Sequence, residues 1–234
     1  MVSETVPINL VVLGPPGAGK GTQAIRFAEG HEIPKISTGD ILRDAVQSGS
    51  DLGRRAETIM NAGGLVDDQL VIAIVQERLT RSDVVRGFVL DGFPRTVAQA
   101  TALDKIMVGR GELFVVEIEV PDDTLVERVA RRRVCDQCGN VTSTAVGVAR
   151  RCARCGGELV LRSDDTELAV RERLRVYAEE TRPLVGHYYS GRPTFRDVDG
   201  DQPATVVGAA LAEAVRDILA TLPAVSAASE GLAG

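Results

Sequence analysis

Residues 14–22 read GPPGAGKGT, the pattern of a loop that binds phosphate groups. Glycines in such a loop let backbone N–H groups turn toward phosphate oxygens, and the helix that follows adds the positive end of its dipole. Lys20 supplies a point charge that reaches the β- and γ-phosphates. A tight turn that happens to contain a lysine is the alternative, but an apolar run at 8–13 and a helical pattern at 22–29 favour strand, loop and helix. The loop therefore predicts a nucleotide-binding site.

Asp91 is the candidate residue for positioning the Mg²⁺ ion that accompanies a nucleotide. It ends an apolar run at 87–91, and phosphate-loop enzymes place such a carboxylate near the phosphates. An aspartate that simply begins a turn before Gly92 is the alternative. The loop departs from its commonest form because Gly21 stands where Ser or Thr usually binds the ion, and we expect Thr22 to substitute in part.

Arginines recur at the expected ends of helices and strands. A single arginine is usually a solvated surface residue, but phosphoryl transfer between two nucleotides brings two polyanions together. Guanidinium groups neutralise and orient phosphate oxygens through paired hydrogen bonds, and one such group can change a rate by roughly 10³–10⁵. We therefore expect Lys20 to be joined in one site by Arg43, Arg95, Arg132, Arg162 and Arg173.

The four cysteines all fall between residues 135 and 155, in two Cys-x-x-Cys-Gly units. Each unit can place two thiolates on one ion, and two units complete the four-sulfur set of a structural Zn²⁺ site, with no position left open. A redox dithiol is the alternative, but it needs one pair and gives no reason for a second. Iron would fit the same ligands. The spacing predicts structural Zn²⁺ bound by Cys135, Cys138, Cys152 and Cys155.

The composition is that of an ordinary globular protein. The chain has 234 residues, of which 44% are hydrophobic and 26% charged, and its net charge of −6 argues against non-specific nucleic-acid binding. It has no apolar run near the ~20 residues that span a membrane, and its first residues lack the basic and apolar regions of a signal peptide. We therefore expect a cytoplasmic protein whose partners include neither a nucleic acid nor a membrane.

Strand and helix patterns alternate along the chain. Strands are predicted at 8–13, 33–37, 87–91, 113–120 and 195–198, and short hairpins at 134–160. Helices are predicted at 21–29, 41–47, 52–61, 67–79, 96–108, 122–133, 164–189 and 204–222, with a kink near Pro183. The alternation predicts an α/β fold like that of phosphate-loop NTPases, with a parallel five-stranded sheet flanked by helices. Ligands of such sheets bind outside the carboxyl ends of the strands.

Five motifs taken together resemble those of the adenylate kinases. They lie at 14–22, 36–43, 91–95, 131–133 and 162–165, and their order and spacing are similar to those of the long, bacterial-type form of that family. The resemblance runs from about residue 8 to residue 222, which is nearly the whole chain.

The resemblance implies a role for each motif. It places on ATP the residues Gly17, Ala18, Gly19, Lys20, Gly21, Thr22, Arg128, Arg132, Thr142, Ser143 and Gln202. It places on AMP the residues Thr38, Arg43, Gly64, Leu65, Val66, Gly92, Phe93, Pro94, Arg95, Gln99, Arg162 and Arg173, with Gln99 reading the adenine edge. It assigns catalysis to Lys20, Arg43, Asp91, Arg95, Arg132, Arg162 and Arg173.

The resemblance also divides the chain into domains. It implies a core nucleotide-binding domain at 1–36, 67–130 and 166–222, a mobile helical AMP-binding insertion at 37–66, a small β lid at 131–165 and a flexible tail at 223–234. Adenylate kinases of this form often carry zinc in the lid, where the metal stabilises a unit too small for a large core. Relatives often place Tyr and His near the ATP base where this chain has Thr142 and Ser143.

The activity that the resemblance implies is ATP + AMP ⇌ 2 ADP, with Mg²⁺ and direct in-line transfer, in a monomer that maintains purine nucleotides. Another nucleoside monophosphate kinase, acting on UMP and CMP or on GMP, is the near alternative. A nucleic-acid-binding NTPase with a zinc ribbon is a distant one, since aromatic residues make up 3% of the chain and Trp is absent. A protein that binds nucleotide without turnover is a further alternative.

Overall fold

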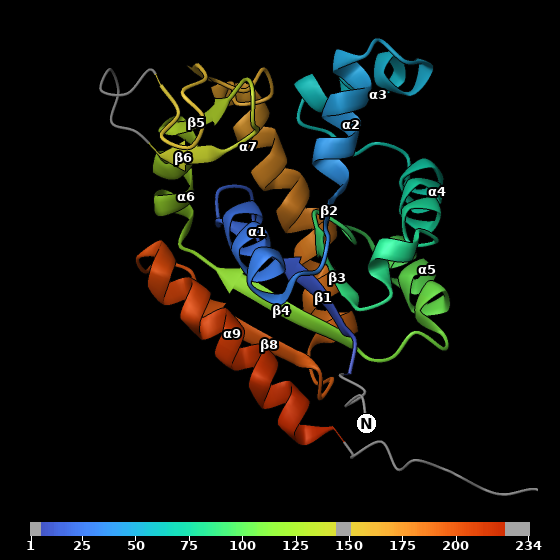
Figure 1. The fold of residues 1–234 in the computed structure, drawn as a ribbon. Helices are drawn as coiled ribbons and strands as arrows, with labels where there is room; N and C mark the ends of the chain where they lie inside the picture. Colours follow the sequence, from blue (N-terminus) through green and yellow to red (C-terminus); the bar gives the residue numbers. More distant parts are fainter. Residues whose placement is uncertain (1–5, 144–150, 223–234) are drawn as a thin grey trace, which may run out of the picture.

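The computed structural model describes residues 6–143 and 151–222, so the tail predicted at 223–234 lies outside the described residues. Its centre is a parallel five-stranded sheet with strand order β2-β3-β1-β4-β8 (Figure 1), which confirms the predicted fold class. The strands are β1 (Ile8–Leu13), β2 (Lys35–Ser37), β3 (Gly87–Asp91), β4 (Leu113–Glu119) and β8 (Phe195–Asp199).

Helices cover both faces of the sheet because alternate residues of each buried strand point to opposite sides. Leu10 and Val12 of β1 pack with α1 (Lys20–His31) and α9 (Ala204–Thr221). Val11 and Leu13 pack on the other face with α4 (Asp68–Arg78) and α5 (Val97–Met107). A short 3₁₀ turn, η1 (Ser82–Val84), follows α4. In the described part of the chain no helix combines the length and apolar character that crossing a membrane requires.

A pair of helices is inserted between β2 and β3. These helices are α2 (Thr38–Gln47) and α3 (Asp51–Asn61), and Ser37 and Ser50 cap their N-termini by accepting hydrogen bonds from backbone N–H groups. Gly53 allows their close packing, since a Cβ there would overlap the carbonyl oxygen of Ala45. The pair lies within the segment predicted at 37–66.

A small antiparallel sheet, with strand order β6-β5-β7, is formed by parts of the cysteine segment, and in the described residues it confirms the predicted antiparallel pairing. Its strands are β5 (Arg132–Cys135), β6 (Val141–Ser143) and β7 (Leu159–Val160). The helix predicted at 122–133 was wrong at its end, because α6 (Asp122–Ala130) stops before Arg132. Residues 132–135 instead pair with strands on both sides, and this pairing overrides the helical pattern.

The helix predicted at 164–189 was only partly right. It starts at Thr166, which caps α7 (Glu167–Val176), and continues through wider π-helical turns, η2 (Tyr177–Thr181) and η3 (Val185–Tyr189), on either side of α8 (Arg182–Leu184). Pro183 has no N–H to donate, so the regular ladder is interrupted near the predicted kink. In Figure 1 the α2–α3 pair and the small sheet stand at the top of the view, on two sides of α7.

Candidate active site

The phosphate loop leads from the carboxyl end of β1 into α1. Gly14, Gly17 and Gly19 have φ values of 137°, 91° and 96°, a region that favours glycine. At Gly14 a Cβ would also lie 2.5 Å from the carbonyl oxygen of Ile118 on the neighbouring strand. The loop can therefore close tightly and leave the first N–H groups of α1 facing outward, as an anion site needs.

Lys20 lies across this loop. Its Nζ donates to the carbonyl oxygens of Gly14, at 2.7 Å, and Pro15, at 2.9 Å. Burial, aided by the nearby charges of Arg95, Arg173 and Arg132, lowers the pKa of Lys20 to about 7, while Asp91 acts in the opposite direction. The ammonium group is thus poorly compensated by the protein, and phosphate oxygens would supply the missing negative charge.

Asp91, at the carboxyl end of β3, faces the phosphate loop and a second lysine. A Cβ on Gly21 would lie 3.2 Å from Asp91 Oδ2, so the carboxylate borders the position where a Ser or Thr is common. Lys35 Nζ lies 3.7 Å from the same oxygen and donates to Asp40 Oδ2 at 2.7 Å. Burial favours the neutral acid, but Lys35 and Arg43 outweigh it and hold the pKa of Asp40 well below its usual range.

Asp40 and Asp91 lie near each other, since both contact the amine of Lys35, and carboxylate oxygens with water are the ligands that Mg²⁺ prefers. The sequence interpretation missed Lys35 and Asp40. One signal was available: Lys35 is two residues before Ser37, so both point to the same face of β2, and Ser37 pairs with Asp91 in the sheet.

Two adjacent acids hold the predicted arginines together. Asp165 Oδ2 accepts from Arg132 Nε at 2.7 Å, and Asp165 Oδ1 accepts from Arg173 at 3.1 Å. Asp164 lies 3.3 Å from Arg173 and 3.7 Å from Arg43. The interpretation of the sequence did not assign a role to these acids, although they form part of the 162–165 motif.

Arg95 and Arg162 lie in the same group without an ion pair of their own within 4.0 Å among the described residues. Burial first, and then neighbouring arginines, lower the pKa of each to about 10. Arg95 Nε donates to the carbonyl oxygen of Gly92 at 2.9 Å, whereas the buried Nε of Arg162 has no partner in the described structure. The five predicted arginines therefore converge, with fewer acids than cations around them.

A cavity lies between α2, the segment after α3, and the loop after β3. Among the residues predicted for AMP, its lining includes Thr38, Arg43, Gly64, Leu65, Val66, Gly92, Arg95, Gln99 and Arg173. Arg162 is not in this lining. Pro94 instead lines a second cavity against the phosphate loop, and Phe93 is completely buried in the core. Thr38 Oγ1 donates to the carbonyl oxygen of Gly92 at 2.9 Å and ties α2 to this loop.

Residues predicted near the ATP base lie at the ends of α6, β6 and β8. Arg128 Nη2 lies 3.5 Å from Asp201 Oδ1, and Gln202 Nε2 donates to Asp199 at 2.9 Å. Thr142 and Ser143 are in β6, where Ser143 pairs with Arg132. The structure thus places Ser143 next to the arginine cluster, and the described part of the segment ends there.

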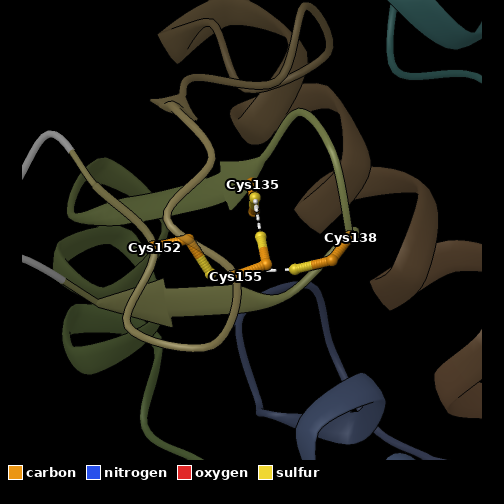
Figure 2. Close-up of side chains that lie close together, drawn as sticks. All are labelled: Cys135, Cys138, Cys152 and Cys155. Carbon is orange, nitrogen blue, oxygen red and sulfur yellow. Dashed lines mark hydrogen bonds between the residues drawn. The ribbon is translucent and has the colours of Figure 1, made fainter.

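The four cysteines form one cluster: Cys135 ends β5, the other three lie in the turns beside the small sheet, and Figure 2 shows their sulfur atoms gathered together. All four lie within 4.8 Å of one another; Cys135 and Cys155 are 3.4 Å apart, and Cys138 and Cys152 are 3.7 Å apart. Four sulfurs at about 2.3 Å from a tetrahedral ion would be about 3.8 Å apart, whereas a disulfide needs about 2.05 Å. The arrangement fits a metal ion.

The two cysteine units have the same backbone geometry. Gly139 donates to the carbonyl oxygen of Cys135 at 3.0 Å, and Gly156 donates to that of Cys152 at 2.9 Å. Both glycines have positive φ values, 66° and 78°, so each chain reverses directly after its second cysteine. The repeated turn brings both thiols of each unit to the same point.

A phosphate loop at the carboxyl edge of a parallel sheet, facing arginines from separate elements, defines a nucleoside monophosphate kinase of the phosphate-loop class. Residues 12–192 match the family model for adenylate kinase. The chain is 50% identical to an adenylate kinase of Moorella thermoacetica over 89% of this chain and 98% of that protein. It is 48% identical to one from Archaeoglobus fulgidus, over 82% and 91% of the two chains, and 44% identical to one from Lachnospira eligens, over 87% and 98%. The chain belongs to the adenylate kinase family, whose members are phosphotransferases.

Proposed function

We propose that the protein transfers the terminal phosphoryl group of ATP to AMP, reversibly and with Mg²⁺, to give two molecules of ADP. The observation that carries this proposal is the shared boundary of the two cavities. Arg95 and Arg173 line both the cavity against the phosphate loop and the cavity beside Thr38. A group that moves from one nucleotide to the other would pass these two guanidinium groups.

Charge and alignment would supply most of the catalysis. The AMP phosphate is already nucleophilic, so the arginines need only neutralise and orient the oxygens of the two substrates. The unpartnered Nε of Arg162 supports this role, since a buried donor without a partner in the described structure is costly and a phosphate oxygen would satisfy it. Lys20 would bind the phosphates of the donor.

Asp91 and Asp40 are the residues that would hold Mg²⁺ or its bound water. The ion, when bound, would neutralise negative charge on the β- and γ-phosphate oxygens. Gly21 brings no hydroxyl to this position, so the two carboxylates and the neighbouring Thr22 are the oxygen donors that this chain offers.

We assign substrate-binding roles to two mobile units, the AMP-binding insertion at 37–66 and the lid at 131–165, with the other described residues as the core. The lid would exclude water, which would otherwise accept the phosphoryl group. We assign Zn²⁺ to the four-cysteine cluster, since the thiolate set and sulfur spacing suit its tetrahedral geometry. The four cysteines form no disulfide, which suits the reducing conditions of the cytoplasm, where we place the protein. We also propose that it is a monomer.

A coupled assay of ADP formation tests the proposed function. With MgATP as donor, AMP should be a good acceptor and CMP, UMP and GMP should react far more slowly. Lys20→Met should abolish transfer without loss of the fold, because this side chain faces the site. Equal rates with CMP would contradict the AMP assignment, and near-normal turnover of the Lys20 variant would contradict the assignment of the phosphate loop.

A further inference from the structure

The amide of Gln99 is held at both of its ends. The residue is 2% exposed and lines the cavity beside Thr38. Its Oε1 accepts a hydrogen bond from the backbone N–H of Arg95 at 2.8 Å, and its Nε2 donates to Asp68 Oδ1 at 2.7 Å. A backbone N–H can only donate, and a carboxylate only accepts, so the two partners select one of the two orientations of the amide.

Asp68 is itself held in place. Its other oxygen accepts from Thr96 Oγ1 at 2.8 Å, and that hydroxyl also caps α5 by accepting from the N–H of Gln99 at 3.2 Å. Asp68 belongs to the first turn of α4, where a carboxylate is favoured by the helix dipole. The carboxylate is therefore a rigid acceptor next to Gln99, supplied by a different helix.

The orientation matters because an amide and a purine can pair in two opposite ways. After its two internal bonds, Gln99 retains one N–H and one lone pair on its oxygen. An adenine edge offers an acceptor at N1 and a donor at the 6-amino group, whereas hypoxanthine offers a donor at N1 and an acceptor at O6. If the amide were rotated by half a turn, its oxygen and nitrogen would change places, and it would pair with hypoxanthine in preference to adenine.

We propose that Asp68 is a positioning residue that makes the acceptor site select a 6-aminopurine over a 6-oxopurine. The proposal rests on the proposed function, in which Gln99 reads the base of AMP. In the reverse orientation Nε2 would face the N–H of Arg95 and Oε1 would face Asp68, so that two donors and two acceptors would oppose each other. Unpaired polar groups of this kind give binding sites their strongest discrimination.

Asp68→Asn tests the proposal because the new side chain is nearly isosteric but can donate as well as accept. The measurement is kcat and KM for AMP and for inosine monophosphate, which differs from AMP at the N1 and C6 edge, with MgATP as donor. We expect the ratio of kcat/KM for AMP to kcat/KM for IMP to fall about tenfold. The preference for AMP should not be lost completely, because the N–H of Arg95 still favours the original orientation of the Gln99 amide. KM for AMP should rise and KM for IMP should fall, with kcat for AMP within about twofold of the wild type.

Asp67→Asn is the matched control. It removes the same charge from the adjacent residue, and asparagine still caps α4 through the N–H of Leu70, so the ratio should not change. Asp68→Glu keeps an acceptor-only group and should retain most of the preference for AMP. If Asp68→Asn does not fold, the AMP-to-IMP ratio can be measured in Asp68→Ala instead, because alanine also removes the acceptor that fixes the Gln99 amide.

Two failures are distinguishable. A ratio that stays within about twofold of the wild type in Asp68→Asn, or an equal loss with AMP and IMP, would overturn the positioning role and leave a structural one. A wild-type protein that forms no ADP from AMP would instead contradict the proposed function itself.

Discussion

Lys20 is buried and lies near three arginines, so its protonation is sensitive to any negative charge bound beside it. With a pKa near 7, it carries its proton only part of the time at neutral pH. A base whose pKa is lowered on folding destabilises the folded state at pH values below the folded pKa. This cost is relieved as the pH rises from about 7 toward the unfolded value of 10.5.

Nucleotide binding should therefore be coupled to proton uptake. Phosphate oxygens next to Lys20 favour the ammonium form. We therefore expect the protein to take up most of one proton when MgATP binds at pH 8, and far less when it binds at pH 6. Calorimetric titrations in two buffers of different ionisation enthalpy measure this number. Lys20→Met is the control and should remove the pH dependence; uptake that is equal at both pH values would argue against a lowered pKa.

Arg95 should act through its shape as well as its charge. Arg95→Lys keeps the positive charge but loses the planar pair of donors, so we predict a fall in kcat of at least about 10²-fold. The exposed pair Arg81–Glu77 provides a control, since Arg81→Lys makes the same substitution at a residue that lines neither cavity and should leave kcat unchanged. A loss of less than threefold at Arg95 would mean that the contact is peripheral.

Residues within short motifs could be predicted from the sequence, whereas those that act across the fold could not. The phosphate loop, the five arginines and the cysteine units have residue types and spacings that specify their chemistry locally. Lys35 and Asp68 act through partners on other elements: Lys35 approaches Asp91 from a neighbouring strand, and Asp68 reaches Gln99 from another helix. Phe93 lies in a recognisable motif, but its side chain is core.

At the scale of elements, the alternation of strands and helices was enough to predict the sheet, because its three central strands, β1, β3 and β4, are short apolar runs separated by helical patterns. The ends of elements were less predictable. Arg132 and Arg133 continue the basic pattern of α6, yet they form β5 because strands from later in the chain pair with both of its edges. Pairing with strands that come later in the sequence is not represented in any local pattern of helix propensity.

The small sheet should depend on its metal. We predict about one Zn²⁺ per chain, and Cys138→Ser should lower the metal content and the stability of the lid more than that of the core. Metal analysis and hydrogen exchange by residue measure the two effects. Protein purified under reducing conditions without chelator that contains no metal would refute the zinc assignment.

The lid should also be permissive toward the donor base. Thr142 and Ser143 cannot stack on a base as aromatic rings do, a contact worth roughly 1–3 kcal/mol at single-stranded nucleic-acid sites. We predict that GTP replaces ATP with less than about a tenfold loss in kcat/KM, under about 1.4 kcal/mol. Steady-state kinetics with both donors measure this, and Thr142→Tyr should sharpen the preference for ATP. A thousandfold preference in the wild type would show that backbone near Gln202 reads the base.

At the scale of the whole molecule, the site joins parts of the chain that are far apart in sequence. Arg43 comes from α2, Arg132 from the small sheet and Arg173 from α7, and Asp164 and Asp165 connect all three. Ion pairs to the segment at 164–165 thus connect α2, the small sheet and α7. A substrate with several phosphates would give the same arginines a second set of acceptors and so connect them directly.

Cationic side chains outnumber acidic ones in the site, so a bound nucleotide would neutralise positive charge that the protein leaves uncompensated. Burial first, and then repulsion from neighbouring arginines, lowers the pKa values of Lys20, Arg95 and Arg162. Inorganic pyrophosphate at about a hundred times its Kd should stabilise the folded state by about 2.7 kcal/mol, and raise Tm by roughly 5–10 °C. Differential scanning calorimetry, with sodium chloride of equal ionic strength as control, measures the shift. The resistance of this protein to proteolysis should then rise with the concentration of phosphate-bearing ligand, because the ligand lowers the population of unfolded chains open to cleavage.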